Sequence, residues 1–172
     1  QVYRLEGMPE QPITSAVASR NQKAVYQNIF NKAAEQVGIF LFYKKGCDFC
    51  EAEMRPLSQF AEKYDFKVIG LVYSTNDIIQ DIPFETKVAP EVFSQYQITS
   101  VPTIAAFHKG KLQVIAKGYT PVSQIELNLK AFLLQEKLIS DDEFVNMWNS
   151  EDTKILQNII QTPEEVNYAN IQ

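Results

Sequence analysis

Apolar positions along the chain follow two different spacings, which divide its first half into strands and a helix. The stretches "IFLFY" at 39–43 and "KVIGLVY" at 67–73 are rich in aromatic and β-branched residues, as is typical of strands buried on both faces. Between them, residues 50–64 place apolar side chains three and four positions apart, which predicts one amphipathic helix that contains Pro56. The order strand, helix, strand predicts a parallel β-α-β unit.

The second half of the chain predicts an antiparallel pair of strands between two helices. The stretches "TIAAFH" at 103–108 and "LQVIAK" at 112–117 are separated by "KGK", a spacing with a central glycine that is typical of a hairpin. A short helix is predicted at 90–98 and a longer one within 122–138. The apolar face of the longer helix comprises Ile125, Leu129, Phe132 and Leu133.

The two ends of the chain differ from this central pattern. Residues 1–14 contain glycine and prolines with little periodicity, which indicates an irregular arm, and residues 15–36 have apolar positions at roughly helical spacing. After Ser140 the chain is polar and acidic, which predicts one or two peripheral helices or a docked tail. We therefore expect three parts: an N-terminal arm and helix at 1–36, an α/β domain at 37–139, and a C-terminal helical extension or tail at 140–172.

Composition and charge narrow the class of function. The 172 residues carry a net charge of −5 with scattered basic residues, so we expect no nucleic-acid partner. No apolar run approaches the roughly 18 residues of a membrane span, so we expect no span in this chain. The chain begins at Gln1 and not at a methionine, which fits both a removed signal peptide and a trimmed chain. A count of two cysteines fits a reduced cytosol and an oxidising periplasm equally well.

The cysteines, Cys47 and Cys50, carry the candidate chemistry in the motif "CDFC". Three interpretations compete: a redox couple, half of a metal site, and a purely structural pair of thiols. The spacing alone does not choose among them. A structural zinc site needs four ligands, and His108 is the single further soft ligand in the chain, so we expect no metal and no other cofactor. Buried thiols that act as small apolar side chains are the structural alternative.

The place of the motif in the predicted fold favours the redox interpretation. Cys47 falls where a helix begins after a buried strand, and the unpaired N–H groups and dipole of that helix end favour a thiolate. Cys50, one helical turn later, is near enough to close a disulfide and release a bound partner. Lys44 and Lys45 also favour the thiolate, whereas Asp48 opposes it. A C-x-x-C motif near a β-α-β unit is the typical redox signal.

Taken together, these features resemble the thioredoxin-fold thiol–disulfide oxidoreductases. The strand "IFLFYKKG", the motif "CDFC", a helix with Pro56, the strand "KVIGLVY", then "TSVPT", a hairpin and a closing helix follow the family's order over roughly residues 38–137. The resemblance implies a thioredoxin-like α/β fold: a mixed central sheet flanked by helices, with an N-terminal helical preface and a C-terminal helical extension. It also implies that "VPT" at 101–103 is a cis-proline loop beside Cys47.

The same resemblance implies roles for individual residues. Cys47 would attack and Cys50 would resolve the mixed disulfide. Many relatives carry a buried acid where this chain has Leu41, so proton transfer would fall to water or to a group such as Glu51 or Lys45. The residues that would border a substrate groove are Phe49, Val101, Pro102 and Tyr119, with packing as the alternative role of the two aromatic rings.

Within that superfamily the chain is similar to the TraF-type proteins of bacterial conjugation and type IV secretion. The features that carry this likeness are "FLFYKKGCDFCEAEMRPLSQFAEKYDFKVIGLVYS", a long insert before the proline loop, "GYTPVSQIELNL" after the hairpin, and the helical preface. The likeness implies a periplasmic location, with the cytoplasm as the alternative.

The expected function is therefore that of an enzyme, a protein thiol–disulfide oxidoreductase that oxidises, reduces or isomerises disulfides during assembly of a conjugation or secretion apparatus. The expected partners are cysteine-containing protein substrates, a redox partner protein and components of that apparatus. The alternative function is a non-catalytic assembly or chaperone subunit that uses the thioredoxin-like domain as a docking platform.

Overall fold

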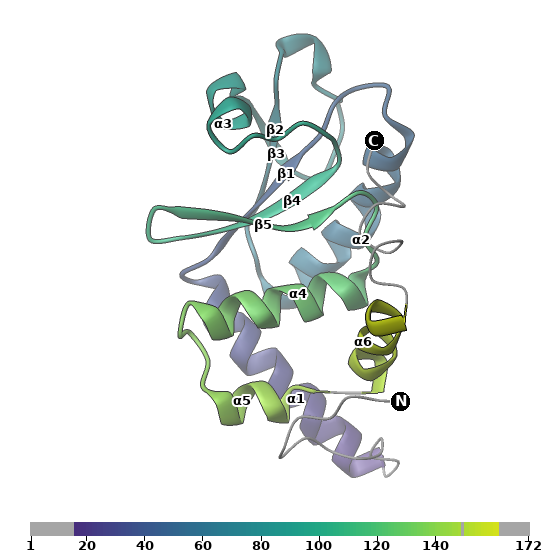
Figure 1. Cartoon of the computed structure of the whole chain (residues 1–172), viewed down its shortest axis with the longest axis vertical. Coiled ribbons are helices and arrows are strands. Elements are labelled where there is room, and N and C mark those ends of the chain that lie inside the picture. The colour runs from purple at the N-terminus through teal and green to yellow at the C-terminus, as the bar shows by residue number, and fades with distance from the viewer. Residues whose placement is uncertain (1–15, 149, 162–172) are drawn as a thin grey trace.

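The computed structural model describes residues 16–148 and 150–161, which form a mixed sheet with helices on both faces (Figure 1). The strands are β1 (Gly38–Phe42), β2 (Val68–Val72), β3 (Glu85–Val88), β4 (Thr103–His108) and β5 (Lys111–Lys117). The helices are α1 (Ala16–Ala34), α2 (Asp48–Tyr64), the 3-10 turn η1 (Thr75–Asp77), α3 (Pro90–Gln95), α4 (Val122–Gln135), α5 (Asp141–Asn146) and α6 (Ser150–Gln161). Within the described ranges, no helix combines the length and the apolar content needed to cross a bilayer.

Strand β1 lies at the centre of the sheet, whose order is β3-β2-β1-β4-β5. It pairs in parallel with β2, with Ile39 opposite Val68, and β2 in turn pairs in parallel with β3. On its other side β1 pairs antiparallel with β4, which forms an antiparallel hairpin with β5. The predicted parallel β-α-β unit and the predicted hairpin are confirmed, and together with the flanking helices they give a thioredoxin-like fold.

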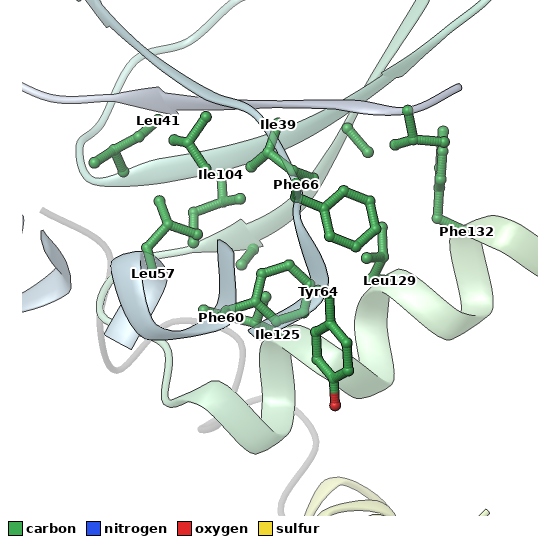
Figure 2. Packing of buried hydrophobic residues seen from close by; sticks show 14 of the residues in the cluster. Ile39, Leu41, Leu57, Phe60, Tyr64, Phe66, Ile104, Ile125, Leu129 and Phe132 are labelled. Carbon is green, nitrogen blue, oxygen red and sulfur yellow. The ribbon is translucent and has the colours of Figure 1, made fainter. Parts of the chain in front are cut away.

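Side chains of β1 alternate between two apolar layers on opposite faces of the sheet. On one face Ile39 packs with Leu57 of α2 and Leu129 of α4 in the larger core (Figure 2). On the other face Phe42 packs edge-on against Phe93 of α3, with ring centroids 5.0 Å apart. Burial on both faces explains why the strand is apolar at nearly every position.

Strand β3 was not predicted from the sequence, where this region was described as part of a long insert before the proline loop. The four residues Glu85–Val88 pair in parallel with β2 alone, at the edge of the sheet. Their side chains are exposed or half-exposed, so nothing requires an apolar or alternating pattern. A short polar edge strand is therefore specified by its backbone pairing with β2 and leaves little signal in the sequence.

Tyr43 anchors the segment between β2 and β3. Its hydroxyl lies 2.8 Å from Thr86 Oγ1 of β3, and the backbone N–H of Ile79 donates to it at 3.3 Å. The ring packs closely against Gly70 of β2, where an added Cβ would come within 2.8 Å of Tyr43 Cε2. Glycine at this position thus allows the close approach that holds the segment next to the end of β1.

Helices α1, α5 and α6 lie beyond α4 as seen from the sheet (Figure 1). The buried Lys130 of α4 joins them, because its Nζ donates to Tyr26 of α1, to Asp152 of α6 and, at 3.0 Å, to the carbonyl oxygen of Met147. The peripheral helices predicted after Ser140 are confirmed as α5 and α6. A buried ion pair attaches them to the rest of the molecule.

Candidate active site

The two cysteines lie where the chain turns from β1 into α2. Cys47 is the N-cap of α2 in an extended backbone conformation, and its Sγ accepts the backbone N–H of Cys50 at 3.1 Å. The two residues form a disulfide across Cα atoms 5.2 Å apart. Cys47 is 8% exposed and Cys50 is fully buried, so the first cysteine is the one that a partner can reach.

The helix end supplies the electrostatic environment that the sequence analysis expected. An N–H group of the first turn already points at Cys47 Sγ, and the same hydrogen bond would stabilise a thiolate after reduction of the disulfide. The neighbouring charged side chains are exposed, so their mutual interactions are screened by water and contribute weakly. These side chains are Lys44, Lys45, Asp48 and Glu51.

The loop before β4 lies against the first cysteine. The Val101–Pro102 peptide bond is cis, and the carbonyl oxygen of Val101 is 4.0 Å from Cys47 Sγ. The loop is tied to the end of β5 by a hydrogen bond from Gly118 N–H to the Pro102 carbonyl oxygen at 2.8 Å. Residues 54 positions apart in the chain therefore meet at the reactive sulfur.

A pocket of about 570 Å³ opens beside Cys47. Of the four residues that sequence analysis placed at a groove, Phe49 and Val101 line this pocket. Pro102 is buried and Tyr119 is half-buried, and neither belongs to the pocket lining. Their part in substrate binding stays a prediction.

One wall of the pocket was not predicted from the sequence. That wall contains Tyr73, which directly follows β2, together with Phe93 of α3 and Ile98. A signal for Tyr73 exists in the sequence, because the carboxyl ends of adjacent parallel strands meet at one edge of a sheet. Tyr73 after β2 and Cys47 after β1 are therefore expected at the same edge.

Glu53 is a buried acid behind the cysteines, one helical turn after Cys50. It is fully buried, and its Oε1 accepts the backbone N–H of Thr120 at 2.6 Å, whereas Oε2 has no hydrogen-bond partner among the described residues. Burial raises the pKa of Glu53 to about 8, and the Thr120 hydrogen bond acts in the opposite direction. The groups suggested from the sequence, Glu51 and Lys45, are exposed.

A sequence signal for Glu53 was present and overlooked. It occupies a position of the apolar stripe of α2, three residues after Cys50 and four before Leu57, both of which are buried. A charged residue on such a stripe is either neutralised or given a polar partner, since an isolated buried charge is costly. Here Thr120 of the loop after β5 supplies that partner.

The sequence of the chain matches a known protein family. A model of the TraF family, described as F plasmid transfer operon protein, matches residues 2–130. The chain belongs to the TraF family. The resemblance stated from the sequence is thereby confirmed. No curated protein matches the chain.

Solved structures similar to this TraF-family protein share low sequence identity with it. StoA from Bacillus subtilis is 17% identical, with a TM-score of 0.44, over 55% of this chain and 82% of StoA. Thioredoxin 1 from Thermosipho africanus is 16% identical, with a TM-score of 0.41, over 58% of this chain and 98% of its own. Tryparedoxin I from Leishmania major is 17% identical, with a TM-score of 0.41, over 70% of this chain and 96% of its own.

His108 was considered in the sequence analysis as a further metal ligand, but in this TraF-family protein it lies away from the cysteines. It is buried at the end of β4, where its Nδ1 is 3.0 Å from Glu136 Oε1 of the segment after α4. Lys111 Nζ donates to the other carboxylate oxygen of Glu136 at 2.9 Å. The histidine thus joins the hairpin to the end of α4.

The raised pKa of Glu53 gives a prediction for stability against pH. In the folded state its carboxyl holds a proton up to about pH 8, whereas the ordinary value is 4.5. Unfolding therefore releases a proton between these pH values, and the free energy of unfolding falls as pH rises through this window. The slope is at most about 1.4 kcal/mol per pH unit. Glu53→Gln cannot titrate and keeps an acceptor for Thr120, so wild type should lose stability relative to this variant from pH 5 to pH 8.

The measurement is urea unfolding of the oxidised protein at several pH values. Glu51→Gln is the matched control, because Glu51 is an exposed acid on the same helix two residues earlier. Its stability curve should run parallel to that of wild type. Parallel curves for Glu53→Gln as well would show that Glu53 does not hold a proton in the folded protein.

Proposed function

We propose that this protein is a thiol–disulfide oxidoreductase that exchanges disulfides with cysteine-containing proteins. The observation that supports this most is the disulfide at the start of α2, whose accessible sulfur, Cys47 Sγ, lies beside the Val101 carbonyl and lines a pocket. A structural disulfide would need neither the helix N-terminus nor an open pocket. The backbone of Val101 is suited to hydrogen bond with an extended substrate segment next to Cys47.

In the reducing direction, the Cys47 thiolate attacks one sulfur of a substrate disulfide. A bond forms between Cys47 and the substrate, and the other substrate sulfur leaves as a thiolate. Cys50 then loses its proton and attacks Cys47 Sγ, which closes the disulfide and releases the remaining substrate sulfur as a thiolate. Two electrons have passed from the cysteine pair to the substrate, and oxidation of a substrate is the reverse sequence.

Glu53 is the group we assign to the proton of Cys50. It lies one turn away on the same face of α2, and water has little access to either residue because both are fully buried. A carboxyl with a pKa of about 8 exchanges protons readily near neutral pH. In its ionised form, about a tenth of the molecules at pH 7 for a pKa of about 8, Glu53 would accept the proton of Cys50 during reduction, and in its neutral form it would give a proton to Cys50 when Cys50 leaves as a thiolate during oxidation.

Membership of the TraF family supports a role in assembling a conjugation or type IV secretion apparatus, because the family's description names a plasmid transfer operon. In this role the protein acts in the periplasm on apparatus components that contain cysteines. A redox partner protein resets the Cys47–Cys50 pair after each turnover.

The proposal is tested by reduction of insulin with dithiothreitol, followed by turbidity. Wild type should accelerate precipitation of the insulin B chain, and the double variant Cys47→Ser with Cys50→Ser should not exceed the rate with reagent alone. An equal rate for both proteins would contradict the proposed enzyme, provided that circular dichroism shows the variant to be folded.

A second candidate function, a docking platform, is favoured by helices α5 and α6. They add to the sheet and its covering helices and are attached through the buried Lys130–Asp152 pair. The same double cysteine variant distinguishes the two functions in cells whose conjugation depends on this gene. Normal conjugation by the variant would favour the platform, and lost conjugation would favour the enzyme.

A further inference from the structure

The pocket beside Cys47 has an aromatic wall that is built outward from the core. Phe42 of β1 is fully buried and packs edge-on against Phe93 of α3, at 5.0 Å between ring centroids. Phe93 in turn packs edge-on against Tyr73, at 5.7 Å. Tyr73 as a whole residue is 56% exposed, so a partly open aromatic surface is held in place by two packed rings.

Phe49 provides a second open aromatic surface at the same pocket. This residue is 41% exposed and follows Asp48 at the start of α2. Phe49 and Tyr73 both belong to the small group of large apolar residues that are exposed within the described ranges, and both line the pocket that contains Cys47. Exposed apolar side chains that gather around a reactive group indicate a binding surface.

The residues that line the pocket carry more negative than positive charge. Its lining includes the carboxylates Asp48 and Asp77 and one ammonium group, Lys44. An acidic side chain that enters between the apolar walls would lose hydration and would meet the half-buried Asp77, so loss of hydration and like charge both oppose it. The lining therefore suits an uncharged apolar side chain and disfavours an acidic one.

We propose that this pocket selects target cysteines that are flanked by an aromatic or large aliphatic side chain and discriminates against those flanked by an acidic one. This inference rests on the proposed function, because the pocket matters only if Cys47 exchanges disulfides. The occupant is a segment of a substrate protein. Its cysteine meets Cys47 while the neighbouring side chain lies between Phe49 and Tyr73.

The reaction that reports on this selection begins with the oxidised protein and a peptide that contains two cysteines. A peptide thiolate attacks Cys47 Sγ, the bond to Cys50 breaks, and Cys50 leaves as a thiolate and takes up a proton. The second peptide thiolate then attacks the first peptide sulfur. A peptide disulfide forms and Cys47 leaves as a thiolate, so the peptide loses two electrons and the cysteine pair gains them.

The experiment compares two such peptides that differ only in the residue next to the attacking cysteine, phenylalanine in one and glutamate in the other. We expect wild type to oxidise the phenylalanine peptide about tenfold faster, as burial of an aromatic side chain in a partly open pocket allows. Tyr73→Ala should reduce this ratio to about twofold, by removal of the outer ring of the wall.

Phe107→Ala is the matched control for Tyr73→Ala. Phe107 is 36% exposed and packs edge-on against Phe40, at 5.9 Å, but it lies near the far end of β4 from the proline loop and outside the pocket lining. For Phe107→Ala, the ratio of the oxidation rates of the two peptides should equal that of wild type. Asp77→Asn is a second, independent test. Because it removes a carboxylate charge from the pocket lining, it should accelerate oxidation of the glutamate peptide relative to the phenylalanine peptide.

Three results would overturn the inference. Equal rates for the two peptides with wild type would show that the pocket does not select, although the enzyme is active. An unchanged ratio in both Tyr73→Ala and Asp77→Asn would place any selection elsewhere. Oxidation of neither peptide would contradict the proposed function itself, and the inference with it.

Discussion

Cys50→Ser is expected to accumulate covalent complexes with substrate proteins, whereas Cys47→Ser is expected to form none. The difference follows from position, because Cys47 is the N-cap of α2 and can be reached from the pocket, while Cys50 is fully buried. Without Cys50, the disulfide between Cys47 and a substrate has no resolving thiol and persists. Without Cys47, the remaining thiol is the buried Cys50, and a serine hydroxyl is a far weaker nucleophile than a thiolate.

The complexes are detected by non-reducing electrophoresis after alkylation of cell extracts, and they must disappear on reduction. The two variants are matched controls for each other, since each changes one sulfur to oxygen. Insulin reduction should fall to the background rate in Cys47→Ser. Trapped complexes in Cys47→Ser and not in Cys50→Ser would reverse the assignment of the attacking sulfur.

The second large effect concerns stability and the attachment of the C-terminal helices. Lys130 is fully buried, and its ammonium group donates to Asp152 of α6. Burial lowers the pKa of Lys130, and Asp152 acts against this by favouring the charged form. Lys130→Met takes the ammonium away from a buried carboxylate, which is expected to lower the free energy of unfolding by about 3–5 kcal/mol.

Urea unfolding at neutral pH measures this loss. Lys63→Met is the matched control, because Lys63 also pairs with a carboxylate of another helix, Glu126 at 3.3 Å, but its side chain is 54% exposed. That change should cost less than about 1 kcal/mol. Equal losses of unfolding free energy in the two variants would show that the buried Lys130–Asp152 pair stabilises the protein no more than the Lys63–Glu126 pair does. The double change Lys130→Met with Asp152→Leu should recover much of the stability, since it leaves no buried charge.

The local pattern was sufficient to predict most elements of the fold. Strands β1 and β4 are apolar runs that match their nearly complete burial, the helix after the cysteines has an apolar stripe at helical spacing, and the turn between β4 and β5 has a central glycine. Strand β3 could not be predicted in the same way, because an exposed edge strand of four residues has no buried face. Its existence depends on hydrogen bonds to β2, which a local pattern does not contain.

The candidate site likewise combines residues that local sequence features predicted with contacts that they could not predict. Cys47 and Cys50 were found from their spacing and their place at a helix start, both of which are local features. The place of Glu53 on the apolar stripe of α2 is a local signal that was overlooked, whereas its hydrogen bond to Thr120, 67 positions away, could not be predicted from a local pattern. The end of β2 places Tyr73 at the same sheet edge as Cys47, but its packing against Phe93 of another element could not be predicted from a local pattern.

The sequence by itself therefore determined the order of the elements, the buried strands and the pair of sulfurs one helical turn apart. These features depend on backbone geometry and on the period of apolar residues over a few turns. The loop of Val101 beside Cys47 was expected from the family resemblance, and only the tertiary structure decided the other groups near the sulfurs: the aromatic wall of Tyr73 and Phe93, and the hydrogen bond from Thr120 to the buried carboxyl of Glu53. Such contacts join residues far apart in the chain, and they form only when the sheet and its two apolar layers pack together.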